Sequence, residues 1–449
     1  MNHILKGLIM AALLAPCGSS LAKNAAKTEA KGPTEENVIN EQDLYNNPGL
    51  FNTVINEGMN QHNLELLGAL LPLYRDYPAR DAFLSDYASA YLAREEGDFA
   101  KAVRYYQELV AKQPNEDILR FQLAQVLFAN RQDIEAGKEL AILKQKSLPK
   151  DFAEGVKRLE EMLEERRNWH YSVSGSALYE KNVNGASSVE KYGNWTFDTK
   201  KKTGYGINVG LSAEKQLPLQ NGFFIPASVS ANWNWYWNAG KYNDLNMRAQ
   251  AGIGWHNGRQ EISAEPFISR RFVGNKGYSN HMGLATNWRY ALTPQWQIRA
   301  YNQTSEERHD ERKHLNGTRV NSGATLIYQP QPETYYFAGA NNYYNGARDS
   351  EDRYTLNGGN VGFGKRWENG LNSTASFSYS FRKHKGKDLL NIVRQDKIYR
   401  LRLGAGHEKL SWKGFEPLFT VDFTRTDSNH PLYDRPFDWN VNMELLKRF

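Results

Sequence analysis

The spacing of apolar residues changes once along the chain, near Trp169. Between about 46 and 167, apolar side chains recur every three or four residues, as at Leu64 and Leu67, which is typical of amphipathic helices. After Trp169 they occupy every second position, as expected for strands with one apolar face. This change predicts a helical domain at 46–167 followed by a β domain at 168–449.

The helical domain contains an internal repeat. Residues 83–116 and 117–150 align with a period of about 34 residues, the spacing of tetratricopeptide repeats. Ala90 matches Ala124 in this alignment, and small residues at such positions let two helices approach closely. A degenerate unit ending near Tyr77 precedes the two. We therefore predict a tetratricopeptide-like domain.

Stacked repeats of this kind form a concave surface that can hold an extended segment of another protein. A rigid spacer is the alternative role. If the domain binds a partner, the candidate contact residues are Tyr87, Tyr91 and Tyr106, although tyrosines at such positions also serve as core.

The β domain contains about fourteen strand-like segments with no helix-length gap between them, an even number as bacterial single-chain barrels have. Short connections such as His256–Gly258 alternate with other connections, several of them long and charged, such as Lys181–Thr203 and Thr304–His314. The pattern predicts a fourteen-stranded antiparallel barrel that spans the outer membrane of a Gram-negative cell. The helical domain is then periplasmic, and the long loops lie outside the cell.

The face opposite the apolar one carries polar residues, which we predict to point into the lumen. Four arginines belong to this set, namely Arg248, Arg299, Arg400 and Arg402. They either tune a pore or form internal ion pairs with carboxylates such as those of Glu265, Asp422 and Glu444.

The last strand ends on an aromatic residue. Its apolar residues share one face, and such an amphipathic final strand resembles the signal read by the outer-membrane assembly machinery. The residues assigned to this signal are Trp439, Val441, Met443, Leu445 and Phe449.

The first 22 residues have the pattern of a secretory signal peptide, with Lys6 before a short apolar core and small residues before Lys23. A lipoprotein anchor on Cys17 is the alternative. Since Cys17 is the only cysteine, cleavage after Ala22 leaves no disulfide, thiolate metal site or cysteine nucleophile. The polar composition of residues 23–45 predicts a flexible tether.

Candidate chemistry is sparse. The net charge of +6 comes from scattered residues without a nucleic-acid motif, so no nucleic-acid partner is predicted. His309, Asp310 and His314 crowd into the Thr304–His314 segment, which we interpret as a hydrated external loop. No nucleophile elbow or phosphate-binding loop is present. We therefore predict no enzyme activity, no metal and no cofactor.

An exported tetratricopeptide-like unit, Ala90 to Leu143, followed by about fourteen strands and a terminal Phe449, resembles the surface lipoprotein assembly modulator (Slam) family. The resemblance covers nearly all of the mature chain and rests on the order of its parts. It implies a translocator that delivers client lipoproteins or secreted haem- and metal-binding proteins, such as a haemophore, to the cell surface. The implied partners are the client, the barrel assembly machinery, outer-membrane lipid and periplasmic chaperones.

Two other functions remain open from the sequence. An exopolysaccharide exporter also combines helical repeats with a barrel, but it predicts a lumen charged strongly with one sign. A solute porin needs no repeat domain.

Overall fold

The computed structural model describes residues 41–187 and 189–448. The predicted signal peptide at 1–22 and most of the predicted tether at 23–45 lie outside these ranges. Residues 41–45, which the composition assigned to the tether, are helical in the structure. Leu44 explains the difference, because its side chain is buried in the first hydrophobic core.

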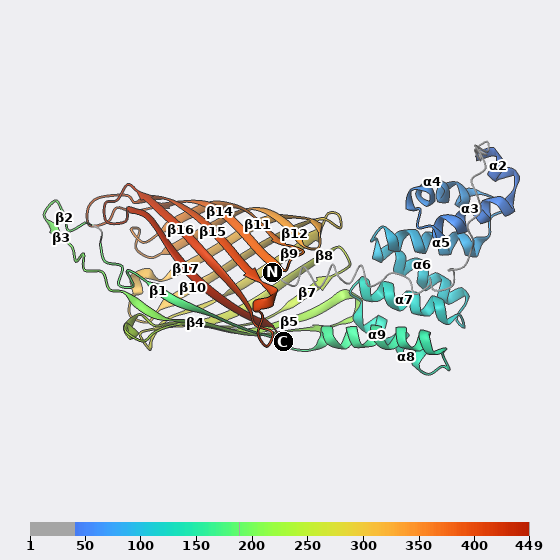
Figure 1. Ribbon diagram of the computed structural model, residues 1–449, viewed down its shortest axis with the longest axis horizontal. Coiled ribbons are helices and arrows are strands. Elements are labelled where there is room, and N and C mark those ends of the chain that lie inside the picture. The colour runs from blue at the N-terminus through green and yellow to red at the C-terminus, as the bar shows by residue number, and fades with distance from the viewer. Residues whose placement is uncertain (1–40, 188, 449) are drawn as a thin grey trace. The chain divides into compact units, whose positions relative to one another are not determined.

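Eight helices precede the first strand in the described part of the chain (Figure 1). Several begin at an Asn or Asp whose side chain accepts a hydrogen bond from a backbone N–H of the first turn, as Asn63 does from Leu66 and Asp81 from Leu84. None of the described helices combines the length and the apolar character needed to cross a membrane. The helices are α2 (Glu41–Asn46), α3 (Pro48–Asn60), α4 (Leu64–Asp76), α5 (Ala82–Glu95), α6 (Phe99–Lys112), α7 (Asp117–Ala129), α8 (Asp133–Lys144) and α9 (Lys150–Arg167).

The helix pairs α5–α6 and α7–α8 coincide with the two predicted repeat units, which confirms the tetratricopeptide-like fold. The matched residues Ala90 and Ala124 are fully buried, as close helix packing requires. Pair α3–α4 forms the preceding degenerate unit, and Tyr77 caps its second helix.

The chain forms two compact units, and the change from one to the other falls within α7. The first ends at Val126, and the second runs from Leu127 through the barrel. Within the second unit, α9 packs against the strand β4 (Gly204–Pro218), and α8 packs against the 3-10 turn at Gln220–Gly222. The change of period after Arg167 therefore marks where helices give way to strands, whereas the packing boundary lies earlier.

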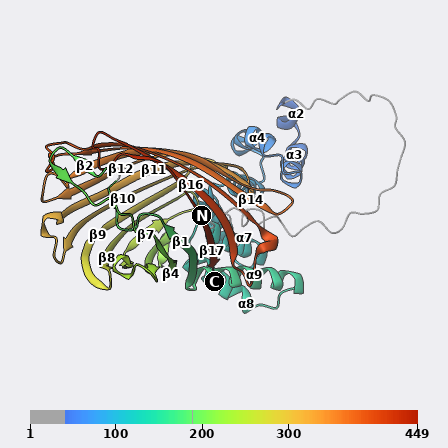
Figure 2. The same cartoon turned by 60° about the vertical axis from the view of Figure 1, so that its left-hand side comes forward.

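Fourteen antiparallel strands close into a barrel, which confirms the predicted fold (Figures 1 and 2). Short segments β2 (Lys191–Tyr192) and β3 (Trp195–Thr196) pair only with each other, in the connection after β1. The barrel strands are β1 (His170–Glu180), β4, β5 (Phe223–Tyr236), β6 (Asp244–Ala251) with β7 (Ile253–His256), β8 (Gln260–Val273), β9 (Lys276–Ala291), β10 (Trp296–His309), β11 (Gly317–Gln331), β12 (Thr334–Ala347), β13 (Tyr354–Arg366), β14 (Leu371–His384), β15 (Gln395–His407), β16 (Glu416–Ser428) and β17 (Arg435–Arg448).

Strands β6 and β7 are two halves of one barrel strand, interrupted at Gly252. A Cβ atom at this position would lie 2.0 Å from the carbonyl oxygen of Ala264 on the neighbouring strand. The close approach of the two backbones explains why glycine occupies the break.

The outer face of the barrel carries exposed apolar side chains. Met282 is 69% exposed, and Ile268 and Ile253 are each more than half exposed. A closed sheet offers these side chains no protein partner, so the belt they form faces lipid. A closed barrel with such a belt is the architecture of an outer-membrane protein.

The strands extend further into the charged segments than the sequence pattern predicts. Strand β10 runs to His309, so the connection after it is residues 310–316 rather than Thr304–His314. Backbone pairing continues past the apolar belt, where the side chains no longer alternate in polarity. We call the end of the barrel at Glu180 and His309 the long-loop end, and the end at His170 and Gly258 the short-turn end.

Candidate functional site

The lumen side of the sheet carries the polar residues of each strand. Arg248 on β6 reaches Gln303 on β10 with a 2.9 Å hydrogen bond, although β8 and β9 separate the two strands. Its guanidinium also lies 3.7 Å from the ring centre of Phe267. This side chain therefore crosses part of the lumen and joins strands that are not neighbours.

The other predicted arginines differ in their partners. Arg402 forms ion pairs with Asp422 at 2.9 Å and Glu444 at 2.7 Å, so it ties β15 to β16 and β17. Arg299 donates to Gln297 on its own strand at 2.9 Å. Arg400 lies on the same face as Arg402 and is exposed. Internal ion pairing, the second alternative from the sequence, thus describes Arg402.

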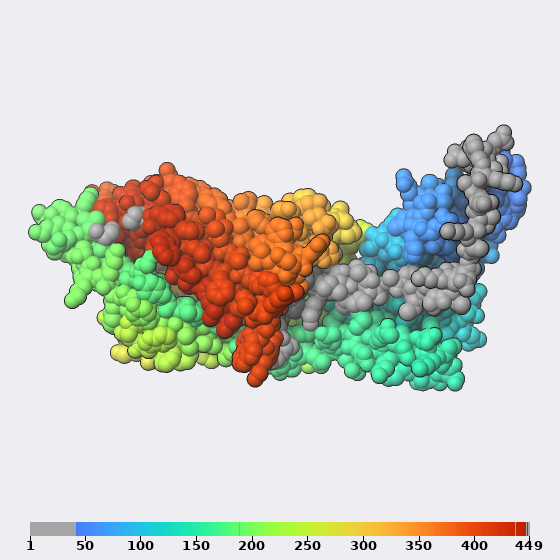
Figure 3. All heavy atoms as spheres, in the orientation of Figure 1, coloured from blue at the N-terminus to red at the C-terminus, as the bar shows by residue number. Residues whose placement is uncertain are grey.

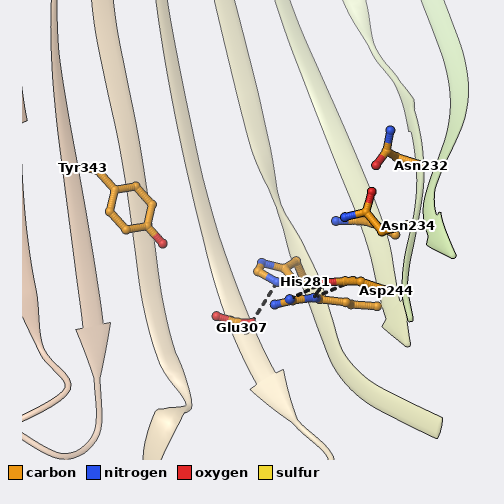
Figure 4. A pocket seen from close by; sticks show the side chains of 8 residues that line it. Asn232, Asn234, Asp244, His281, Glu307 and Tyr343 are labelled. Carbon is orange, nitrogen blue, oxygen red and sulfur yellow. Dashed lines mark hydrogen bonds and ion pairs between the residues drawn. The ribbon is translucent and has the colours of Figure 1, made fainter. Parts of the chain in front are cut away.

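A hollow of about 400 Å³ lies in the lumen toward the long-loop end (Figure 4). Arg271 forms a two-point ion pair with Asp244, at 3.0 and 2.5 Å, on one side of it. His281 contacts Glu307 at 3.0 Å on another. Because the lining groups are polar, the hollow is suited to water and polar chains rather than to an apolar ligand. It is lined by Asn232, Asn234, Asp244, Asn246, Arg271, His281, Glu307 and Tyr343.

Glu307 is the centre of a buried charge cluster beside this hollow. Its carboxylate contacts Arg319 at 2.8 Å and His309 at 3.2 Å, in addition to His281. Glu307, Arg319 and His309 are each less than a tenth exposed. The interpretation of His309 as part of a hydrated loop is therefore wrong, because β10 carries it into the barrel wall.

The described residues contain no group of three or more histidine, cysteine or carboxylate side chains arranged to hold a metal ion. In the Glu307 cluster one carboxylate oxygen contacts His281 and His309 and the other contacts Arg319, so its geometry is that of a structural ion-pair network. It links β9, β10 and β11 near the long-loop end.

At the short-turn end, the turn between α7 and α8 contacts two strand turns. The side chain of Asn130 accepts a 3.1 Å hydrogen bond from the backbone N–H of Gly258. Glu135 accepts one of 2.8 Å from the N–H of Asn221. Arg131, the next residue after Asn130, interacts electrostatically with Glu261 and Arg289 of the barrel wall. Burial lowers the pKa of the Arg131 guanidinium, Arg289 acts in the same direction, and Glu261 opposes both.

A second set of contacts fixes the helices that carry this turn. Arg166 on α9 contacts Asp133 at 2.5 Å and the carbonyl oxygen of Phe128 at 3.1 Å. Its guanidinium lies 3.7 Å from the ring centre of Phe128. Burial and the neighbouring Arg131 lower the pKa of Arg166 to about 9. The α7–α8 turn and α9 therefore form one rigid element at the short-turn end. No spacing motif marks these residues in the sequence, because every contact is long-range.

The predicted client-contact tyrosines lie in the first compact unit. Tyr106 is fully buried and Tyr91 is 6% exposed, so neither reaches the surface of the folded domain. Tyr106 packs against the ring of Tyr87, and the hydroxyl of Tyr91 donates to the carbonyl oxygen of Met59 at 3.0 Å. Client contact by these tyrosines stays a prediction. Tyr87 is partly exposed and its hydroxyl accepts a 2.8 Å hydrogen bond from Gln122.

The last strand places its predicted signal residues on the lipid side. Trp439 and Val441 are more than half exposed, and Met443 is 39% exposed. Leu445 is half-buried. Phe449 lies outside the described residues.

Comparisons with known proteins match both parts of the chain. Residues 169–449 match the family model described as "Surface lipoprotein assembly modifier". Residues 37–140 match the model "Surface lipoprotein assembly modifier, N-terminal TPR repeats". The two matches follow the same order as the strands and helices of the structure.

Individual relatives are similar over most of their length. Surface lipoprotein assembly modifier 1 of Haemophilus influenzae is 31% identical, over 92% of this chain and 87% of the relative. Hemophilin secretion modulator of Acinetobacter baumannii is 22% identical, over 84% of this chain and 81% of the relative. Among solved structures, a bacterial polysaccharide outer membrane secretin shares 14% identity at a TM-score of 0.36, over 63% of this chain and 98% of the other. Since the first family model covers more than half of the chain, the chain belongs to the surface lipoprotein assembly modifier family.

Proposed function

We propose that this protein helps deliver client proteins across the outer membrane to the cell surface, and that it is not an enzyme. The observation that carries the proposal is the joint match of the helical part and the barrel to one family, in the order found here. The names of two relatives point to surface lipoproteins and to a hemophilin as client classes. The clients of this chain are therefore surface lipoproteins or secreted haem-binding proteins.

The placement of the parts follows from the same proposal. Residues 1–22 direct export and are removed, and the following tether leads to a helical domain in the periplasm. The barrel assembly machinery inserts the barrel by reading β17, and periplasmic chaperones deliver the client. With the helical domain on the periplasmic side, the short-turn end of the barrel faces the periplasm.

The charges that line the lumen favour a polypeptide as cargo over a polysaccharide of uniform charge. Charged groups of both signs line it, and several are paired with each other, as in Arg271 with Asp244 and Glu307 with Arg319. A wall of paired charges presents no field of one sign to steer a charged polymer. A diffusion porin would not need the helical repeats.

Contacts near the α7–α8 turn give the proposal a structural connection between the last helical repeat and the barrel. It joins the helical repeat to the short-turn end through Asn130 and Glu135.

Surface exposure of a client tests the proposal. A tagged surface lipoprotein or haemophore would be expressed with this protein in a Gram-negative host, and protease accessibility of the client would be measured on intact cells. A deletion of residues 41–112 removes α2–α6 and keeps the α7–α9 element on the barrel. We expect the client to be exposed on cells that make the full chain and not on cells that make the deletion variant. Heat-modifiable electrophoretic mobility would show that the barrel is folded in both proteins. Equal exposure with and without the full chain, across several clients, would refute the function.

A further inference from the structure

The seam between the first and last strands is closed over only part of its length. Strand β1 pairs with β4 from His170 to Glu180, which is its whole length. With β17 it pairs over five residues only, from Ser172 opposite Arg448 to Ser176 opposite Glu444. Beyond that point the pairing recorded among the described residues stops.

Two strand edges are left facing each other toward the long-loop end. One is Ala177–Glu180 of β1, which is paired to β4 on its other side. The other is residues 438–443 of β17, paired to β16 alone. The other neighbouring strands of the barrel pair over most of their lengths, so the gap is specific to this seam.

One lysine side chain bridges the gap. Nζ of Lys181 contacts a carboxylate oxygen of Asp438 at 3.2 Å and donates to the carbonyl oxygen of Trp439 at 3.1 Å. That carbonyl belongs to the free edge of β17, so a side chain occupies the place of a strand partner. Both charged side chains are well exposed to solvent, and an exposed ion pair of this kind is weak. The contact of Lys181 with β17 is therefore easily displaced.

A hollow of about 220 Å³ occupies the open part of the seam. Its walls combine lumen-side groups with groups of the outer belt: Glu180, Asp438 and Asn440 alternate with Tyr179 and Trp439, whose side chains are exposed on the outer face. The hollow thus meets both the lumen and the lipid surface. The first and last strands lie side by side on the face seen in Figure 3, where they are green and red. The lining residues are Tyr179, Glu180, Lys181, Asp422, Thr424, Asp438, Trp439 and Asn440.

We propose that this open seam accepts an extended segment of the client polypeptide, which pairs as a β-strand with the free edge of β17. The inference rests on the proposed function and names the part of the barrel that handles the client. Backbone N–H and C=O groups at membrane depth require hydrogen-bond partners, and a polypeptide strand supplies them at the matching spacing. A lipid acyl chain has no such groups and would leave the edge unpaired.

The side chains of the seam define the segment that fits. Asp438 on the lumen side loses its cationic partner when Lys181 is displaced, and Glu180 lines the same hollow, so the two carboxylates favour a basic or polar residue there. Trp439 and Val441 on the outer side favour apolar residues at alternate positions. The accepted segment is an amphipathic strand with basic or polar residues toward the lumen.

A disulfide across the seam tests the proposal. Continuing the register from Ser176 and Glu444 places Ala177 opposite Met443, so the variant A177C/M443C locks the gap when oxidised. The matched control is A405C/F419C, a pair of registered partners in the fully paired β15–β16 seam. Heat-modifiable mobility would check that both variants form barrels, and client exposure would be measured oxidised and after reduction.

We expect the oxidised A177C/M443C protein to lose client exposure and to regain it on reduction, with no loss for the control pair. Normal export by the locked protein overturns the seam proposal and leaves the translocation function standing. Absence of export by the unlocked wild-type protein overturns the translocation function, and the seam proposal with it.

A photo-crosslinking residue tests the same point without relying on disulfide formation. It would replace Asn440 at the free edge or, as control, Thr420 on the doubly paired β16. A stalled client should crosslink to the residue at position 440, through one contiguous segment of the client. It should not crosslink to the residue at position 420. Capture of lipid alone at 440, or equal capture of client at both positions, would contradict strand pairing at the seam.

Discussion

The side-chain oxygen of Asn130 accepts a hydrogen bond of 3.1 Å from the backbone N–H of Gly258. Asn130 directly follows α7, and Gly258 lies in the turn between β7 and β8. This contact, with the matching one from Glu135 to Asn221, attaches the end of a helical repeat to the rim of the barrel. The attachment is made by turns, whose backbone groups are not used by the sheet.

We predict that the double variant N130A/E135A loosens this attachment while the barrel remains folded. Each lost hydrogen bond removes roughly 1 kcal/mol, and two turn N–H groups lose their partners. Limited proteolysis should cleave between α9 and β1 faster than in the wild type, and client exposure should fall. Lys138→Ala, which changes an exposed residue of α8, is the control. Unchanged cleavage and unchanged export in the double variant would show that the attachment has no mechanical role.

Glu307 supports a second prediction, on barrel stability. Glu307→Ala leaves the buried guanidinium of Arg319 without its carboxylate, and breaking a buried pair from one side costs about 3–5 kcal/mol. The temperature at which the barrel loses its heat-modifiable mobility should fall clearly. Glu311→Ala, in the exposed connection after β10, should leave that temperature unchanged. Equal melting of the two variants would mean that the Glu307 cluster is hydrated and not structural.

The sequence pattern was sufficient for the fold because the barrel and the repeats are both periodic. Alternation fixes which face of a strand meets lipid, and a period of about 34 residues fixes the repeat helices. The pattern failed where periodicity carries no information. His309 lies beyond the apolar belt, where strands continue without alternation, and it was therefore assigned to a loop.

The candidate site was less predictable for a related reason. Tyr106 and Tyr91 have the residue type of a binding surface, but both side chains are buried inside the helical domain. The Asn130–Gly258 contact joins residues 128 positions apart, and the seam pairs Ser176 with Glu444. Contacts between residues so far apart in the sequence form only when the barrel closes, so the local spacing of residues does not predict them.

Tyr106 allows a test of burial in the helical domain. Its hydroxyl is buried without a hydrogen-bond partner among the described residues, and burial raises the pKa of the phenol. Tyr106→Phe removes an unpaired polar group and should stabilise the domain by about 1 kcal/mol. Thermal unfolding followed by circular dichroism at 222 nm, in detergent, would measure this gain. Tyr105→Phe is the neighbouring control.

The same tyrosine predicts a dependence on alkaline pH. Because the folded pKa is above the unfolded value of about 10, the neutral phenol contributes stability that is fully present below pH 10. That contribution is lost as the pH rises above 10 toward the folded pKa, since only the unfolded chain ionises there. The wild-type domain should therefore lose stability above pH 10 more steeply than Tyr106→Phe. Parallel pH profiles for the two proteins would contradict the burial of the hydroxyl.

Strand β17 allows a test of the two faces of the barrel with a single change of charge. Val441 points to lipid and Asn440, its neighbour, points to the lumen. A lysine on the lipid face near the middle of a strand costs about 2–4 kcal/mol, and the final strand is also the predicted assembly signal. Val441→Lys should reduce the amount of heat-modifiable barrel recovered from outer membranes, whereas Asn440→Lys should assemble normally because its ammonium group stays in the aqueous lumen. Since both variants add the same charge to the same strand, a difference between them reports orientation alone. Equal recovery would show that the apolar face of β17 is neither embedded in lipid nor required for assembly.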